Sequence, residues 1–276
     1  MDIAAHCAAI VRAGNRDRYV ADLLAPDDRR NDLMALHAFD IEVSTIRAKV
    51  TEPTLGEIRL EWWRQALRGD HGGHPVASTL AETIARYRLP IAAFDNLLQA
   101  RVFDLYDDPM PSIGDLEGYA GDTASAVIQL GALILAGGDD PGSAEAAGFA
   151  GVALTIVDII AHLPQTVARG QCLLPADALA REGIKPEELR AGETPVGVRS
   201  VAGELVTRAT DRFAEAQDAA RALDPTVLPA FLPATVVPLY LKRFGNPNRD
   251  PLRDDVTISP LRRQWAIWRA SRRGNF

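Results

Sequence analysis

The segment ALTIVDIIAHLPQTVARGQCLLP, residues 153–175, decides the fold of this chain. Drawn as a helix, it is apolar around most of its circumference, and a helix of that kind lies in the core of a protein. Its few polar side chains fall, at about 100° per residue, within roughly one third of the circumference. The segment therefore predicts a buried helix with one narrow polar stripe, followed by a loop. The stripe consists of Thr155, Asp158, His162, Gln165 and Thr166.

The helical spacing of apolar residues continues through the rest of the chain. Segments rich in Ala and Leu alternate with breaks at Pro and Gly, such as Pro26, Gly72 and Pro90. No run alternates between apolar and polar residues for long enough to predict a strand. With 276 residues, 47% of them hydrophobic, the chain can bury a large core. We predict an all-α protein of about ten helices in one domain over residues 1–276, because there is no repeat, low-complexity tract or long linker.

Charge and cysteine content limit the classes of function. The net charge is −7, but the segment from Lys242 onward has nine basic and three acidic residues, so it carries +6 and the remainder −13. This asymmetry argues against a nucleic-acid-binding protein and for a local basic contact surface. The two cysteines, Cys7 and Cys172, lack metal-ligand spacing and fit a reducing compartment. Without a secretory signal or a long apolar stretch, we expect a cytoplasmic protein, or one held peripherally at the inner face of the membrane.

The basic tail, about residues 245–276, ends in the amphipathic sequence SPLRRQWAIWRASRRGNF (259–276). Ser259 is suited to cap a helix and Pro260 to occupy its first position. Leu261 and two tryptophans recur at i, i+4 and i+7 among arginines. This composition suits the boundary between lipid headgroups and acyl chains, so it predicts contact with a membrane surface; the alternative is that the tryptophans pack on the body of the protein. The membrane-contact candidates are Trp265, Trp268, Arg269 and Arg272.

The sequence PTLGEIRLEWWRQALRGD (53–70) predicts another helix. An apolar face contains Leu55, Ile58 and Trp62, and we expect Trp62 and Trp63 in the core. The opposite face carries acids early and bases late, as the helix dipole favours, and predicts a solvated surface with weak ion pairs. The charged residues of that face are Glu57, Glu61, Arg64 and Arg68.

Four segments carry a resemblance to a known family. In chain order they are LMALHAFDIEVSTIRAKVTEPTLGEIRLEWWRQAL (33–67), GYAGDTASAVIQLGALIL (118–135), the opening segment extended to residue 179, and LPAFLPATVVPLYLKR (228–243). Together they resemble the squalene/phytoene synthase family. The resemblance implies an isoprenoid-synthase-like bundle of helices around a central cavity, in which two prenyl diphosphates are joined head to head. Two Asp-x-x-x-Asp motifs hold Mg²⁺ in that family, and the metal neutralises the departing pyrophosphate.

Both motifs are altered in this chain. The metal-binding aspartates of the first motif fall on Ser44 and Ala48, and those of the second fall on His162 and Thr166. We therefore predict no metal site and no cofactor. Mg²⁺ is expected only if unconventional ligands such as the Asp158–His162 pair replace the aspartates.

The family's cavity positions supply the other candidate residues. The polar stripe of the opening segment coincides with them, so we expect Thr155, Asp158 and His162 to face an internal cavity opposite His37 and Ser44, away from solvent. The pocket-lining candidates are His37, Ile41, Ser44, Ala48, Tyr119, Thr123, Thr155, Asp158, His162 and Thr166. The candidates for contact with a diphosphate are Arg59, Arg64 and Arg169.

One branch of the family shares the pattern TEPTLGEIR (51–59). In this pattern the chain resembles the mitochondrial respiratory complex I assembly factors of the family and related bacterial proteins. Three alternatives follow: a non-catalytic protein that binds an isoprenoid lipid or assists a protein partner in assembling a membrane complex, an active prenyl-diphosphate transferase with unconventional ligands, or a helical scaffold whose cavity is filled by side chains. Release of pyrophosphate with Mg²⁺ would identify the second.

Overall fold

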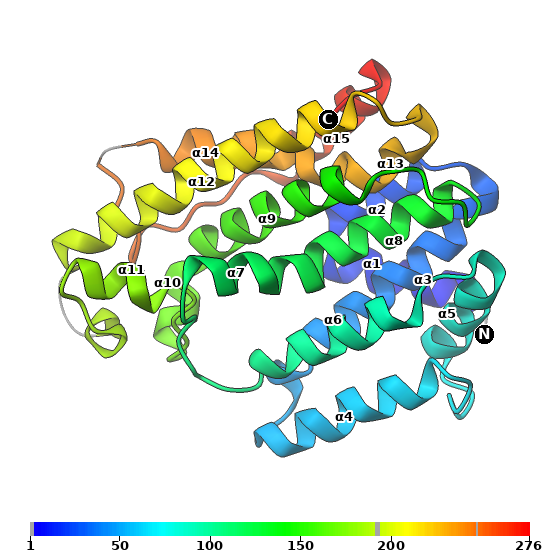
Figure 1. Ribbon diagram of the computed structural model, residues 1–276, viewed down its shortest axis with the longest axis horizontal. Coiled ribbons are helices and arrows are strands. Elements are labelled where there is room, and N and C mark those ends of the chain that lie inside the picture. The colour runs from blue at the N-terminus through cyan, green and yellow to red at the C-terminus, as the bar shows by residue number, and fades with distance from the viewer. Residues whose placement is uncertain (1–2, 191–193, 247) are drawn as a thin grey trace.

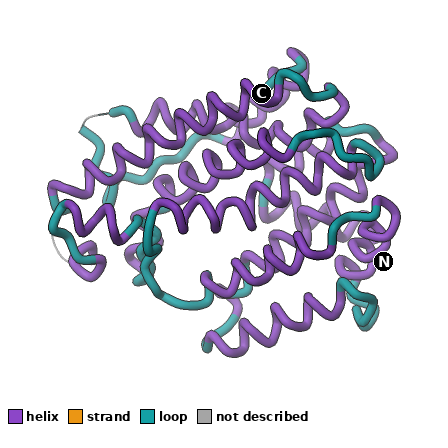
Figure 2. The backbone as a smooth tube through the Cα atoms, in the orientation of Figure 1, coloured by secondary structure: helices purple, strands orange, loops and turns teal. Residues whose placement is uncertain are grey.

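The computed structural model describes residues 3–190, 194–246 and 248–276 of the chain. These residues fold entirely into helices and connecting loops, with no strand among them, so the all-α prediction is confirmed (Figures 1 and 2). The helices of the first half are α1 (Ile3–Gly14), α2 (Arg16–Leu23), α3 (Asp27–Ser44), α4 (Pro53–Ala66), α5 (Pro75–Tyr87), α6 (Ile91–Phe103), α7 (Ile113–Ala120) and α8 (Ala126–Leu135). A 3₁₀ turn, η1 (Arg47–Lys49), follows α3, and a π-helical turn, η2 (Gly121–Ser125), joins α7 to α8.

The second half contains one long helix among short ones. Its α-helices are α9 (Ala144–Ala161), α10 (Leu163–Ala168), α11 (Ala176–Arg181), α12 (Val196–Ala220), α13 (Leu228–Phe231), α14 (Val237–Phe244) and α15 (Pro260–Arg273). The 3₁₀ turns are η3 (Pro186–Arg190), η4 (Pro225–Val227) and η5 (Leu232–Val236). The described chain therefore has fifteen α-helices where about ten were predicted, because prolines divide apolar segments that the pattern alone reads as continuous.

The break between α9 and α10 shows this effect. α9 ends at Ala161, and Pro164 occupies the first turn of α10. A proline has no backbone N–H, so the carbonyl of Ile160 loses the donor that a continuous helix would supply. The guanidinium of Arg249 takes that place, since its Nη2 donates to the Ile160 oxygen at 3.2 Å.

The core forms where α9 packs lengthwise against α12, as Figure 1 shows, and where α3 packs against α1, α5 and α8. α9 also lies so close to η2 that a methyl group added at Gly151 would collide with Ser125. α9 and the segment Pro225–Phe244 are long and apolar enough to cross a membrane by length and composition, but 61% and 56% of these windows are buried inside the protein. Burial in the core accounts for their apolar character.

α4 lies at the edge of the molecule, where it packs on α6 (Figure 1). Its buried residues are Gly56, Leu60, Trp63 and Ala66. Gly56 permits this contact, because a Cβ there would overlap the side chain of Leu105. Trp63 is in the core as predicted, but the prediction for Trp62 is wrong, since its side chain is at the surface. The exposed fractions of Leu55, Ile58 and Trp62 are 47%, 65% and 36%.

Candidate functional site

The polar stripe of the opening segment does not face an enclosed cavity. The side chains of Asp158 and His162 are 75% and 56% exposed, so the prediction that they point inward is wrong. Asp158 lies in the last turn of α9, on a side of the helix that other elements leave open to solvent, and His162 follows the helix as its C-cap residue. Thr155 is half-buried on α9, and Gln165 is exposed on α10, where its amide donates to Asp255.

Asp158 and His162 pair with each other at this helix end. Nδ1 of His162 lies 3.1 Å from a carboxylate oxygen of Asp158 and 2.9 Å from its carbonyl oxygen. The hydrogen bond to Asp158 raises the pKa of His162 to about 9. A protonated imidazole repels a cation and offers it no lone pair, so this pair is a poor metal ligand at neutral pH.

Thr166, the other predicted position of the second motif, is not available to a ligand. Thr166 is buried, and its hydroxyl donates to the carbonyl oxygen of Leu163 at 3.1 Å. An i−3 bond of this kind holds the side chain against its own helix. Thr166 is thus engaged within α10, while Asp158 and His162 are engaged at the surface.

The first motif is also without a metal-binding arrangement. α3 ends at Ser44, whose hydroxyl donates to the carbonyl oxygen of Ile41 at 3.2 Å. Ala48 lies beyond the helix, exposed in η1, and supplies no donor atom. Within residues 3–190, 194–246 and 248–276, no group of three or more His, Cys, Asp and Glu side chains is placed to hold a metal ion.

His37 and Ile41 lie on the part of α3 that faces the N-terminal helices. His37 is buried, with Nδ1 2.9 Å from a carboxylate oxygen of Asp22. Ile41 fills the space beside Gly14, where an added Cβ would come within 2.7 Å of its methyl group. A histidine–aspartate pair and an aliphatic side chain thus stand at two of the predicted pocket-lining positions.

A network of charged and polar groups joins α2, α3, α6 and α7 inside the bundle. Asp40 is 4% exposed and accepts hydrogen bonds from Arg18 and, at 3.0 Å, from Nη2 of Arg101. The other terminal nitrogen of Arg101 donates to Asp104 at 3.1 Å and to the Tyr119 hydroxyl at 2.8 Å. Tyr119 completes the ring by donating to Asp104 at 2.8 Å. We call these five residues the buried network.

Burial and pairing oppose each other in the buried network. Burial would raise the pKa of Asp40, but Arg18 and Arg101 outweigh it and hold that pKa well below its ordinary value of 3.8. Burial raises the pKa of Asp104 despite Arg101, and it also raises the pKa of the Tyr119 phenol. Asp40 is therefore an ionised carboxylate whose two oxygens accept hydrogen bonds from two guanidinium groups, so these oxygens are not available as ligands for Mg²⁺.

Tyr119 and Thr123 mark the segment between α7 and α8. Thr123 is buried, and its hydroxyl donates to the carbonyl oxygen of Tyr119 at 2.6 Å. It lies in η2, and π-helical turns often occur at functional sites. In this chain both side chains satisfy internal partners, Tyr119 in the buried network and Thr123 in the turn.

The diphosphate-contact candidates on α4 lie at its surface. Arg64 bonds to Glu61 at 2.5 Å, and its Nε is 3.7 Å from Asp95 of α6. Arg59 lines a hollow of about 240 Å³ between α4, η1 and the start of α5. The other residues of that hollow are Glu42, Ile46, Lys49, Trp62, Trp63 and His74. Arg169 is exposed at the end of α10, so the structure places it on a different helix from the other two.

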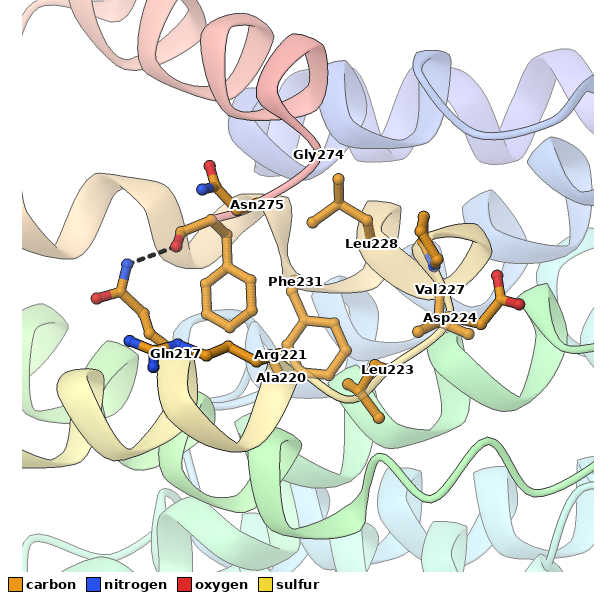
Figure 3. Close-up of a pocket in the computed structure, with 12 residues that line it drawn as sticks. Gln217, Ala220, Arg221, Leu223, Asp224, Val227, Leu228, Phe231, Gly274 and Asn275 are labelled. Atoms are coloured by element: carbon orange, nitrogen blue, oxygen red, sulfur yellow. Dashed lines mark hydrogen bonds between the residues drawn. The ribbon is translucent and has the colours of Figure 1, made fainter.

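A larger hollow of about 430 Å³ lies at the end of α12, where residues after α15 fold back over α13 (Figure 3). Its wall includes the stacked rings of Phe231 and Phe276, whose centroids are 5.0 Å apart. Gln217 donates from its amide to the carbonyl oxygen of Phe276, as the dashed line in Figure 3 marks. This hollow was not predicted, because it joins residues from α12, η4, α13 and the chain end that no sequence spacing connects.

The membrane-contact candidates are where the sequence placed them. Ser259 caps α15, accepting from the Arg262 amide at 3.4 Å, and Pro260 is its first residue, as predicted. Trp265 and Trp268 are exposed by 60% and 43%, whereas Ile267 and Ala270 of the same helix are buried against the protein body. Arg269 and Arg272 are exposed beside them.

The sequence of this chain matches a known protein family over most of its length. The family model described as squalene/phytoene synthase matches residues 11–264. The chain belongs to the squalene/phytoene synthase family. The resemblance predicted from the motifs is confirmed. The assignment of Ser44, Ala48, His162 and Thr166 to the family's aspartate positions stays a prediction from the sequence.

This squalene/phytoene synthase family member has relatives of two kinds. It is 28% identical over 272 residues to "NADH dehydrogenase (ubiquinone) complex I, assembly factor 6" of Rattus norvegicus, covering 96% of this chain and 81% of the relative. It is 26% identical over 210 residues to the phytoene synthase of Thermus thermophilus, covering 75% of this chain and 71% of the relative. The predicted similarity to complex I assembly factors is therefore confirmed.

A solved structure supports the fold of the squalene/phytoene synthase family. Squalene synthase HpnC from Alicyclobacillus acidocaldarius matches with a TM-score of 0.72 and 21% identity, covering 99% of this chain and 94% of that one. The predicted isoprenoid-synthase-like bundle is confirmed. At this identity, the likeness concerns the fold alone.

Proposed function

We propose that this chain is a non-catalytic member of the squalene/phytoene synthase family that assists assembly of a respiratory complex I-type membrane complex. The observation that carries the proposal is the state of the four aspartate positions. Ser44 and Thr166 bond to their own helices, Ala48 has no donor atom, and His162 is paired with Asp158 at the surface. Without bound Mg²⁺, the charge of a departing pyrophosphate is not neutralised.

The similarity to rat complex I assembly factor 6 supports the assembly role, since it extends over 96% of this chain. In this proposal the chain needs no cofactor, and its partner is a protein subunit of the assembling complex. It acts at the inner face of the membrane, where such a complex is built. An isoprenoid or prenyl diphosphate is a further ligand in the proposal, bound without chemical conversion.

The test is the amount of assembled complex I in the membranes of cells that make this chain. Deleting its gene is expected to reduce the fully assembled complex on a native gel, and re-expressing the chain is expected to restore it. The variant Asp158→Ala/His162→Ala is the matched control, and it should restore assembly as well as the unaltered chain because these exposed residues are not catalytic. Unchanged complex I after deletion would contradict the assembly role.

A further inference from the structure

α15 is fixed to the body of the protein by one face. Ile267 is completely buried and Ala270 is 9% exposed, where the helix packs against η5 and α2. On the same side, Nη1 of Arg263 donates to the Tyr240 hydroxyl at 3.2 Å, and its Nε lies 3.5 Å from Asp17. The orientation of the helix is therefore determined, and so is the identity of its outward face.

The outward face is apolar and exposed. The exposed fractions of Leu261, Trp265 and Trp268 are 79%, 60% and 43%. The two indole rings stack on each other, with centroids 4.9 Å apart and planes inclined by 28°. At about 100° per residue, these three residues fall within about 60° of the helix circumference. They form one continuous ridge, which we call the tryptophan ridge.

Only positive charge surrounds the tryptophan ridge on this helix. α15 contains five arginines and no acidic residue. Four of them form no ion pair with a described residue, whereas Arg263 is directed toward Asp17 on the packed side. Arg272 continues the ridge one turn beyond Trp268, and the other three flank it. These four are Arg262, Arg269, Arg272 and Arg273.

α4 offers an internal comparison that separates apolar exposure from charge. Its exposed residues Leu55, Ile58 and Trp62 form a similar ridge. α4, however, carries two acidic and two basic residues and is neutral overall. An anionic surface would attract α15 and not α4, since each basic residue near such a surface strengthens binding and each acidic residue opposes it.

We infer that the tryptophan ridge and its four exposed arginines are a docking surface for an anionic phospholipid bilayer. The tryptophans sit at the boundary between headgroups and acyl chains, and the guanidinium groups contact lipid phosphates. The inference rests on the proposed function for the cellular location of the chain. Binding of the purified protein to vesicles needs no assembling complex, so the two proposals can fail separately.

The first test measures cosedimentation of the full chain with vesicles of phosphatidylglycerol and phosphatidylcholine, and with vesicles of phosphatidylcholine alone. We expect binding to the anionic vesicles at low salt, and a steep loss of binding at high salt. The variant Arg269→Glu/Arg272→Glu should bind at least about tenfold more weakly, because each basic residue contributes roughly fivefold. Equal binding by this variant, or no binding by the full chain at low salt, would overturn the inference.

The second test identifies the ridge itself. Trp265→Ser/Trp268→Ser should lose most vesicle binding, whereas the matched control Leu55→Ser/Trp62→Ser on α4 should retain it. All four side chains are exposed, so both variants should keep the circular-dichroism spectrum and thermal midpoint of the unaltered chain. Equal loss in the two variants would overturn the assignment to α15.

The third test reports the depth of insertion and excludes another partner. In a Trp62→Phe background the remaining tryptophans are Trp265, Trp268 and the buried Trp63, whose emission should stay constant. The part of the emission that comes from Trp265 and Trp268 should shift to the blue on anionic vesicles and be quenched by brominated acyl chains. Quenching that is absent while binding persists would contradict insertion. Arginine and tryptophan can also bind single-stranded nucleic acid, and binding of an oligonucleotide in preference to anionic vesicles would likewise overturn the inference.

Discussion

Two aspartates near the predicted metal-binding positions of the family lie in opposite environments in this chain. Asp40, on α3, is 4% exposed and held by Arg18 and Arg101 in the buried network. The side chain of Asp158, in the last turn of α9, is 75% exposed, and among the described residues its ion pair is with His162. One carboxylate is inaccessible because its charge is neutralised inside the protein, and the other lies in water beside a cation. The comparison shows that an acidic residue close to an altered motif does not by itself make a metal site.

The two aspartates should also differ in how much they contribute to the stability of the protein. Breaking a buried ion pair leaves an uncompensated charge in the interior, which costs several kcal/mol, whereas exposed pairs contribute little. The buried network should therefore dominate the stability of the N-terminal half. Breaking the Asp158–His162 pair should change the free energy of unfolding very little.

The largest effect is expected from Arg101→Met. The substitution removes a donor to Asp40 and the donors to Asp104 and Tyr119, and it should lower the free energy of unfolding by about 3–5 kcal/mol. Urea denaturation measures this change. Arg64→Met is the matched control, because Arg64 pairs at the surface with Glu61 and should cost less than about 1 kcal/mol. Equal losses in the two variants would remove the buried network from the account.

The same network predicts a pH dependence at low pH. The pKa of Asp40 is lowered in the folded protein, so its stabilising contribution is present above pH 3.8 and is lost as the pH falls below that value. Asp40→Asn should therefore lose most stability near neutral pH and progressively less in acid. A difference between the two proteins that stays constant from neutral to acid pH would contradict this assignment.

A smaller effect is expected from Tyr119→Phe. The phenol hydroxyl joins Arg101 to Asp104, and its removal leaves a buried carboxylate oxygen with one donor fewer. We expect a loss of about 1–3 kcal/mol in the free energy of unfolding. Thr123→Val, a substitution of similar size and shape, tests the hydroxyl in the neighbouring turn. If Tyr119→Phe changes the free energy of unfolding by no more than the experimental error, the Tyr119 hydroxyl is not bonded as described.

The smallest effect is expected at the exposed pair. His162→Ala should change stability by less than about 1 kcal/mol, because both partners are solvated. Pairing with Asp158 raises the pKa of His162 from 6.5 to about 9, and because water screens this exposed pair we expect only a small part of that shift as stability. This small contribution should be fully present below pH 6.5 and disappear as the pH rises through the raised pKa. An NMR titration of the His162 ring measures this directly. A midpoint at or below 6.5 would contradict the pairing with Asp158.

Sequence patterns predicted the helices and the family better than the directions of individual side chains. The apolar segments identified the bundle, and Ser259 before α15 with Pro260 at its first position identified the start of that helix, because both signals are local. The outward direction of Asp158 and His162 was missed because it depends on which side of the last turn of α9 other elements cover. The rotation of α4, which exposes Trp62, depends on the close contact between Gly56 and Leu105.

The buried network could not be found from spacing. Asp40 meets Arg18 and Arg101, which are 22 and 61 residues away in the chain, on α2 and α6. In the sequence, Asp40 is only an acidic residue beside the altered first motif. Its partners are determined by how the helices pack, and no local pattern records that packing.

We expect this family member not to convert prenyl diphosphates, and pyrophosphate release tests that expectation most directly. The purified chain is incubated with farnesyl or geranylgeranyl diphosphate and Mg²⁺, and pyrophosphate and hydrocarbon products are measured beside the variant Asp158→Ala/His162→Ala. We predict no squalene or phytoene, and pyrophosphate release equal in the two proteins. Mg²⁺-dependent product formation by the unaltered chain, clearly above that of the variant, would contradict the account and identify an active transferase with unconventional ligands.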